Sequence, residues 1–394
     1  MNITPYRPGQ PLSPAAPLDV AVAPGETLRE VLEELHMSQL ELASRIGASP
    51  KHVNQVVKGI VPISADVAQR LEAATGVPAR IWSRLESDYR TVLAKQSRES
   101  AYAAAAGWMS KVPIRAFVKA GILPASPNDK TSRVDQVLHF FGVASVDAFR
   151  TVTPVAAFRR SSAYEQDDFA VAAWLRLGEV AARASVLPDY DARKLTDVLP
   201  DLRALSLLEP KGALPRLVEM AGGAGVCVVF IPEVEGARAY GATYWVSPKR
   251  PVIQLSTRGR TLDKLWETFF HEVGHVLLHD RKAVFVDEET DSPSLDEESE
   301  ATVFARTVLL PDVEPEDLRT LTTEADVSDF AATLGVPAGI VVAELHRTGL
   351  WEHAQGRALR RTLTPDDLPD SGRPAIPSVR PSRLQWKLPG VTHE

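Results

Sequence analysis

The sequence is poor in cysteine, has no excess of positive charge and lacks long apolar runs. Cys227 is the only cysteine among 394 residues, so neither an internal disulfide nor a cysteine-based zinc cluster can form. Any metal site must therefore use His, Asp and Glu. The counts of 44 Lys and Arg against 51 Asp and Glu give a net charge of -7. This balance excludes a uniformly basic nucleic-acid-binding protein, but it leaves room for a local basic face.

No stretch reaches the ~18 consecutive apolar residues of a membrane span. Met1 to Val20 also lack the apolar run of a signal peptide. We therefore expect a cytoplasmic protein with no membrane contact. The chain is about two and a half times the usual ~150 residues of a domain, which predicts two or three domains.

Composition and periodicity divide the chain into five segments. Residues 1–24, rich in Pro and Ala, predict a flexible N-terminus. Residues 25–96 show short helical patterns separated by Gly, Ser and Pro, which predict an all-α domain, and residues 97–225 predict a helical lead-in. Residues 226–352 mix strand and helix patterns and predict an α+β domain. Residues 353–394 combine prolines and arginines with few apolar anchors, which is typical of a disordered tail.

The α+β segment begins with β-branched and aromatic runs. These predict strands at Val226–Ile231, Ala242–Val246 and Val252–Leu255. A long helix is expected from Thr261 to His279. The acidic stretch Asp287–Glu300 then leads into a helix that ends at Leu309.

The spacing of small and apolar residues after Gln39 predicts a helix-turn-helix. This motif needs a small residue where its helices touch, a residue that permits the turn, and apolar contacts at fixed offsets. With Gln39 as position one, Ala43 is fifth and Gly47 is ninth. The fourth, eighth, tenth, fifteenth and eighteenth positions are all apolar, namely Leu42, Ile46, Ala48, Val53 and Val56.

The second helix of this motif, opened by Ser49 and Pro50, would enter the major groove of DNA. Asn and Gln can read adenine, and Lys can contact guanine or phosphate. No acidic residue lies between Leu42 and Ala65. The expected DNA-binding residues are Gln39, Ser49, Lys51, His52, Asn54, Gln55 and Lys58. The alternative is a helical protein-interaction module in which these side chains are solvated surface.

The run PGETLREVLEELHMSQLELASRIGASPKHVNQVVKG resembles the Xre-type DNA-binding fold, and specifically the HigA group of antitoxins. The resemblance covers about residues 25–90. It implies a homodimer that binds operator DNA.

His271, Glu272 and His275 form an H-E-x-x-H motif within a predicted helix. Residues four apart share a helical face, so both imidazoles can reach one Zn²⁺. Glu272 would hold a water against the metal and act as general base in peptide hydrolysis.

Catalytic zinc needs a third protein ligand. His279 lies on the same helix, but ligands at three successive turns drift around the axis, so His279 is expected to support the site or cap the helix. Glu297, Glu298 and Glu300 head the next predicted helix and offer a carboxylate from a second element. The residues alone leave these acids as alternatives.

The segments GATYW, PVIQLSTRGR, WETFFHEVGHVLLH and EESEATVFARTVLLP resemble the ImmA/IrrE family of metallopeptidases, which cleave repressors. The resemblance implies a zincin-like fold, with the glutamate before an Ala-Asn pair as third ligand. That residue is Glu300 here, with Thr302 in place of Asn. The implied metal triad is His271, His275 and Glu300. Tyr244 is a weaker candidate for polarising the scissile carbonyl, and a structural tyrosine is the alternative.

Two main functions are compatible with these motifs, beside a third, a peptidase in which the helix-turn-helix has no regulatory role. The first is a DNA-binding regulator whose zinc-dependent endopeptidase domain cleaves a repressor or partner protein. The second is an antitoxin or autorepressor whose zincin-like domain serves only as a sensing or toxin-binding module.

Overall fold

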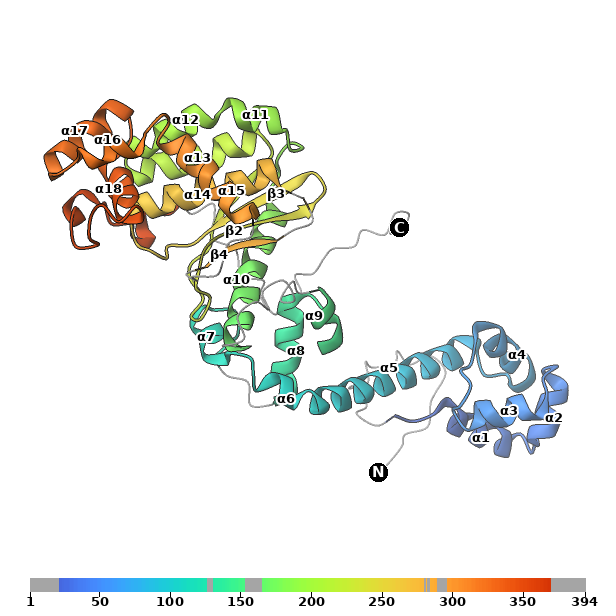
Figure 1. Cartoon of the computed structure of the whole chain (residues 1–394). Helices are drawn as coiled ribbons and strands as arrows, with labels where there is room; N and C mark the ends of the chain where they lie inside the picture. The colour runs from blue at the N-terminus through green and yellow to red at the C-terminus, as the bar shows by residue number, and fades with distance from the viewer. Residues whose placement is uncertain are drawn as a thin grey trace. The chain divides into compact units, whose positions relative to one another are not determined.

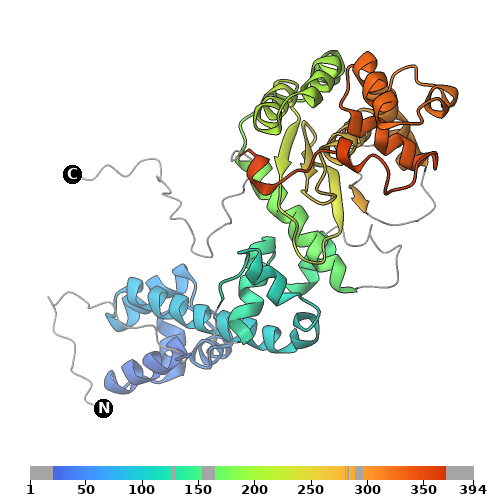
Figure 2. The same cartoon turned by 90° about the vertical axis from the view of Figure 1, so that its left-hand side faces the viewer.

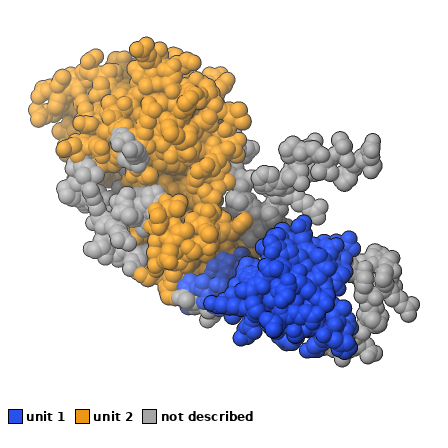
Figure 3. Space-filling view, turned by 90° about the vertical axis from the view of Figure 1, so that its right-hand side faces the viewer, with its two compact units in different colours: residues 1–106 blue, residues 107–394 orange. Residues whose placement is uncertain are grey.

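The computed structural model describes residues 21–125, 130–152, 165–279, 281, 284–288 and 296–369. The predicted N-terminal segment is therefore described only from residue 21, and the predicted tail only to residue 369. The chain divides into two compact units, residues 1–106 and residues 107–394 (Figure 3).

The N-terminal unit is built of helices, as the sequence predicts, and the last of them has 26 residues. Ser38, Ser49 and Ser64 each accept a hydrogen bond from a backbone N–H in the first turn of a helix. Gly47, with a φ of 64°, forms the turn between the second and third helices. The helices are α1 Pro24–Glu34, α2 Gln39–Arg45, α3 Pro50–Val57, α4 Ala65–Thr75 and α5 Ala79–Ala104. The last of these extends beyond the predicted domain boundary at residue 96.

The apolar faces of these helices form one hydrophobic core. Trp82 of α5 is fully buried, and its Nε1 donates to the carbonyl of Val77 at 3.2 Å. The apolar positions of the helix-turn-helix pattern, Leu42, Ile46, Val53 and Val56, all belong to this core.

The second unit opens with helices. They are α6 Ala106–Met109, α7 Ile114–Lys119, α8 Lys130–Phe141, α9 Val146–Val152, α10 Glu165–Ala184, α11 Ala192–Asp197, α12 Leu199–Ala204 and α13 Pro210–Gly223, with the 3₁₀ turn η2 Leu205–Leu207 after α12. The helical lead-in predicted from the sequence is thus present among the described residues.

A four-stranded sheet follows, in the order β1-β3-β2-β4. Three of its strands, β2, β3 and β4, are labelled in Figure 1, and Figure 2 shows the sheet from another side. Its strands are β1 Cys227–Phe230, β2 Ala239–Ser247, β3 Arg250–Leu255 and β4 Phe285–Glu288. β1 pairs with β3 in parallel, whereas β2 pairs with both β3 and β4 in antiparallel. The sequence predicts the first three strands and misses β4, whose second half, Asp287 and Glu288, falls in the predicted acidic stretch.

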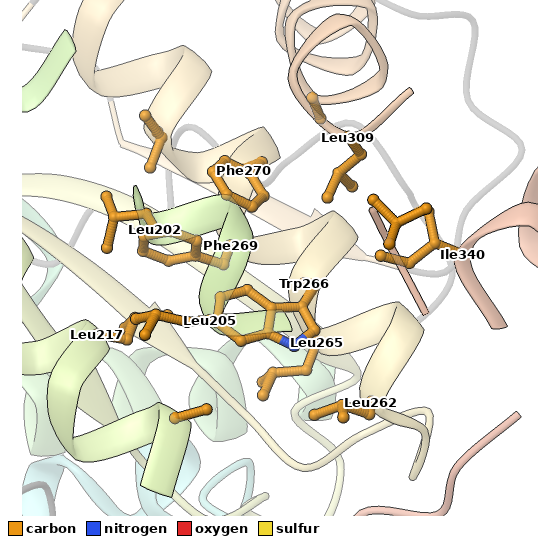
Figure 4. Close-up of a cluster of buried hydrophobic side chains, with 14 of the residues drawn as sticks. Leu202, Leu205, Leu217, Leu262, Leu265, Trp266, Phe269, Phe270, Leu309 and Ile340 are labelled. Atoms are coloured by element: carbon orange, nitrogen blue, oxygen red, sulfur yellow. The ribbon is translucent and has the colours of Figure 1, made fainter. Parts of the chain in front are cut away.

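Most of the remaining elements share one hydrophobic core with the sheet. The full set comprises α14 Leu262–Leu278, α15 Asp296–Leu309, α16 Pro315–Arg319, α17 Glu324–Leu334, α18 Ala338–Arg347 and the 3₁₀ turns η3 Arg357–Leu359 and η4 Pro365–Asp367. α14 is the centre of this packing, because its Trp266, Phe269 and Phe270 are fully buried (Figure 4). Burial of these three rings holds α14 rigidly against its neighbours.

Part of the predicted tail is ordered. The amide of Leu262, which begins α14, donates to the carbonyl of Arg361, and the amide of Leu363 donates to the carbonyl of Arg260, both at 2.9 Å. Leu363 and Leu368 are buried in the main core. The low apolar content of the tail predicted disorder, but these two leucines are sufficient to anchor its first part.

Within the described part of the chain, no single helix is long and apolar enough to cross a membrane. α17 and α18 satisfy the length and composition only as a pair, and they are bent by 114° at the break between them.

Candidate metal centre and nucleic-acid interface

The H-E-x-x-H motif lies in the C-terminal half of α14, as predicted. His271 and His275 lie one turn apart on this helix, and their Nε2 atoms are 3.0 Å from each other. The side chain of His275 is 1% exposed and that of His271 is 13% exposed. The buried rings of α14 therefore fix the backbone from which both imidazoles project.

Glu298 of α15 completes a group of three metal-ligating atoms. Its Oε2 lies 3.1 Å from His271 Nε2 and 3.6 Å from His275 Nε2. Zn–N and Zn–O bonds of ~2.0–2.1 Å in a tetrahedron separate neighbouring ligand atoms by about 3.3 Å. The three distances bracket this value, so the donor set fits one tetrahedral cation with a fourth position open.

The resemblance assigned the third ligand position to Glu300, but the structure brings Glu298 there. Ala301 and Ala305 form the buried face of α15, and Glu298 precedes them by three and seven residues, which is the same helical face. Glu300 is out of phase with that face. Its side chain is 62% exposed, and its Oε2 lies 3.2 Å from His279 Nε2.

Because α14 and α15 pack closely, the face of α15 on which a carboxylate lies decides whether it reaches the ligand group. A Cβ on Gly274 would lie 3.0 Å from the Cα of Ala301, so the two helices approach closely between the histidines. The helical spacing of Ala301 and Ala305 is the sequence signal that favours Glu298 over Glu297 and Glu300 as the third ligand.

Electrostatics in the group suit a cation. Burial alone would raise the pKa of Glu298, but the neighbouring imidazoles of His271 and His275 outweigh it and lower the pKa to about 2. Burial lowers the pKa of His275, against the effect of Glu298. Metal binding requires an ionised carboxylate and unprotonated imidazole nitrogens, and the lowered pKa values of Glu298 and His275 favour both.

Glu272 is fully buried between α14 and β2. Thr243 donates from its Oγ1 to the carbonyl of Glu272 at 3.1 Å. A Cβ on Gly241 would lie 2.6 Å from Glu272 Oε1 and 2.4 Å from the Cγ2 of Thr268. Gly241 therefore makes the space that the Glu272 carboxylate occupies. Sequence reasoning missed this residue, although a glycine inside a strand pattern signals a close approach.

Tyr244 lies away from the histidines. Its hydroxyl donates to Gln254 Oε1 at 2.9 Å and lies beside Gly178 of α10, on the sheet face opposite to the one that Gly241 presents to α14. Burial raises the pKa of this hydroxyl well above its usual value. These contacts therefore favour a structural tyrosine over a residue that polarises the scissile carbonyl.

β4 is the strand next to the histidines. The ring of Phe285 stacks on His275 with centroids 4.0 Å apart. Since β4 pairs with β2 on one side, it lies at the edge of the described sheet. Of the three predicted strands, β2 and β3 lie inside the sheet, and β1 forms its opposite edge among the described residues.

Six of the predicted DNA-binding residues belong to α3 and its caps, and Gln39 begins α2. Ser49 caps α3, and Lys51, Asn54 and Lys58 are exposed opposite the buried valines. Gln39 and Gln55 are half-buried.

His52 is also half-buried, and it borders a small cavity with Leu42 and Leu71, so its ring is turned partly toward the core. Arg45, another cation of this region, is paired with Glu41 at 2.6 Å. The exposed cations of α3 are therefore Lys51 and, at its C-cap, Lys58.

Comparison with known proteins identifies both regions. Residues 28–82 match the family described as Helix-turn-helix. Virulence-associated protein I of Dichelobacter nodosus is 35% identical over 81 residues, which are 20% of this chain and 75% of that protein. The chain belongs to the Xre-type helix-turn-helix family. Residues 225–346 match the IrrE N-terminal-like domain, a peptidase family, so the chain also carries an IrrE-like domain.

Two solved antitoxin structures are similar to about a fifth of this chain. An addiction module antidote protein of the HigA family from Coxiella burnetii is 30% identical, with 20% of this chain and 88% of that chain covered and a TM-score of 0.20. The antitoxin HigA of Pseudomonas aeruginosa, solved with the higBA promoter, is 35% identical, with 23% and 91% covered and a TM-score of 0.18.

Proposed function

We propose that this protein is a DNA-binding transcriptional regulator whose IrrE-like domain is a zinc-dependent endopeptidase that cleaves a repressor or partner protein. The observation that carries the proposal is the group of His271, His275 and Glu298, whose ligand atoms have tetrahedral spacing beside the buried Glu272. Ligands from two helices with an open fourth position favour a catalytic metal over a structural one.

His271 and His275 would hold zinc through Nε2, and Glu298 through a carboxylate oxygen. Bound zinc would polarise the scissile carbonyl and make a water more acidic. Glu272 accepts the proton of the attacking water and delivers it to the leaving amine. Gly241 and Thr243 hold Glu272 in place for both transfers. A fully buried position keeps its carboxylate away from bulk water.

A peptide substrate would add to β4 as a further strand. Its main chain would then pair with the edge of β4 that pairs with no strand among the described residues, beside Phe285 and His275. This mode recognises an extended segment of a partner protein through its backbone.

The helix-turn-helix domain would bind operator DNA as a homodimer, with α3 in the major groove. Asn54 and Gln55 would read base edges, while Lys51 and Lys58 would contact phosphate or guanine. The family match over residues 28–82 and the exposure of Lys51, Asn54 and Lys58 support this role. A protein that acts on operators works in the compartment of the DNA, the cytoplasm.

The test is incubation of purified protein with the products of neighbouring reading frames, in parallel with Glu272→Gln. The amide cannot accept the proton, so we expect cleavage to fall by ~10²–10⁴-fold while metal and DNA binding persist. An unaltered cleavage rate would discard the peptidase. A zinc-bound wild type that binds but does not cleave its partners would instead support the antitoxin with a toxin-binding or sensing domain.

A further inference from the structure

Both metal-site histidines have a partner on the ring nitrogen that faces away from the ligand group. His271 Nδ1 lies 3.4 Å from the Oγ1 of Thr302 on α15. His275 Nδ1 lies 2.8 Å from the Nδ1 of His279. A histidine binds metal through one nitrogen only when the other carries the proton, so these two contacts concern metal binding directly.

The Thr302 contact has one consistent direction. Its hydroxyl donates to the carbonyl of Glu298 at 2.8 Å, which uses its only proton. Thr302 Oγ1 can then only accept from His271. This requires a proton on His271 Nδ1 and leaves a lone pair on Nε2, the atom that faces Glu298.

The second contact joins His275 to His279, and His279 in turn contacts Glu300. His279 Nε2 lies 3.2 Å from Glu300 Oε2, and the side chain of His279 is 3% exposed. A carboxylate oxygen accepts, so His279 Nε2 donates to Glu300, and Nδ1 of the same ring is the atom that accepts from His275. His275 must then donate from Nδ1, which leaves the lone pair of its Nε2 facing the ligand group.

We propose that Thr302 and the His279–Glu300 pair are positioning residues that set the tautomer and ring orientation of His271 and His275. The inference rests on the proposed metal site. It gives Glu300 a role different from that of a ligand: Glu298 binds the metal, and Glu300 acts through His279. α15 thus supplies one ligand and an anchor for each imidazole.

The experiment measures zinc and cobalt(II) dissociation constants of the full chain by competition with a chelator. Thr302→Ala and Glu300→Ala each weaken binding by about 10–100-fold, the usual effect of losing the partner of a ligand histidine. Thr302→Ser keeps the hydroxyl and retains most of the affinity. The visible spectrum of cobalt(II) keeps its tetrahedral form in Glu300→Ala, because the three ligands are unchanged.

Two matched controls separate these contacts from helix stability and charge. Thr307→Ala removes a hydroxyl that donates to the carbonyl four residues earlier, as Thr302 does, but lies away from the histidines. Glu297→Gln removes a charge from the same turn as Glu300. Both controls should bind metal like the wild type.

Unchanged dissociation constants in Thr302→Ala and Glu300→Ala would overturn the proposal, as would a cobalt(II) spectrum showing a lost ligand in Glu300→Ala. A wild type without metal affinity overturns it too. Failure to cleave any partner, with metal bound and the predicted losses observed, contradicts only the proposed peptidase.

Discussion

The helix-turn-helix and the metal centre differ in how their functional groups are assembled. The proposed DNA contacts lie on one helix and its cap, and Lys51, Asn54 and Lys58 are exposed. The metal centre draws on α14, α15 and β2, and its Glu272 and His275 are buried. A surface that reads a large partner can adapt side chain by side chain, whereas a centre that holds an ion depends on how the surrounding elements pack.

The largest effect that sharpens this contrast is expected at Gly241. In Gly241→Ala the new methyl group would overlap Glu272 Oε1 and the Cγ2 of Thr268 and push the carboxylate aside. A misplacement of ~1 Å costs about 10²-fold in rate, so cleavage should fall by that order with metal bound. Rates and zinc content measured together check this.

Gly212→Ala on α13 is the matched control, because nothing lies within 4 Å of a Cβ at that site. It should cleave like the wild type. If Gly241→Ala does so as well, Gly241 does not position Glu272.

A smaller effect is expected from Asn54→Ala on the exposed face of α3. Loss of a base contact costs ~1–3 kcal/mol and relaxes the preference at one base pair. Binding to an operator selected from random oligonucleotides should weaken, while binding to unrelated DNA should not change. Gln69→Ala, an exposed polar residue of α4, is the control. Equal operator affinity in both variants would remove Asn54 from the interface.

The smallest effect is expected from Lys58→Ala. A phosphate contact contributes to all sequences alike, so affinity for operator and unrelated DNA should fall together and the salt slope should decrease by ~1. Titrations at several salt concentrations measure this. Arg84→Ala removes an exposed cation already paired with Asp88 and should leave the slope unchanged; a base-specific loss at Lys58 would instead assign that residue to guanine.

The same contrast explains what the sequence could reveal. Helix-turn-helix packing depends on neighbours within one short segment, so the offsets of Ala43 and Gly47 were sufficient to predict it. The spacing of His271 and His275 was equally local. Choosing Glu298 over Glu300 required the phase of α15 against α14, which only the buried face of Ala301 and Ala305 defines.

Contacts between residues far apart in the sequence could not be predicted from local sequence patterns. β4 is held by pairing with β2, and the space at Gly241 exists only because Glu272 packs against it. The anchoring of Leu363 in the main core likewise depends on residues far away in the sequence.

The most direct test of the metal centre is zinc stoichiometry, measured by mass spectrometry on wild type, Glu298→Ala and Glu300→Ala after saturation with zinc and removal of excess ion. We predict one zinc per chain for the wild type and for Glu300→Ala, and none for Glu298→Ala. Zinc retained by Glu298→Ala and lost from Glu300→Ala would contradict the account.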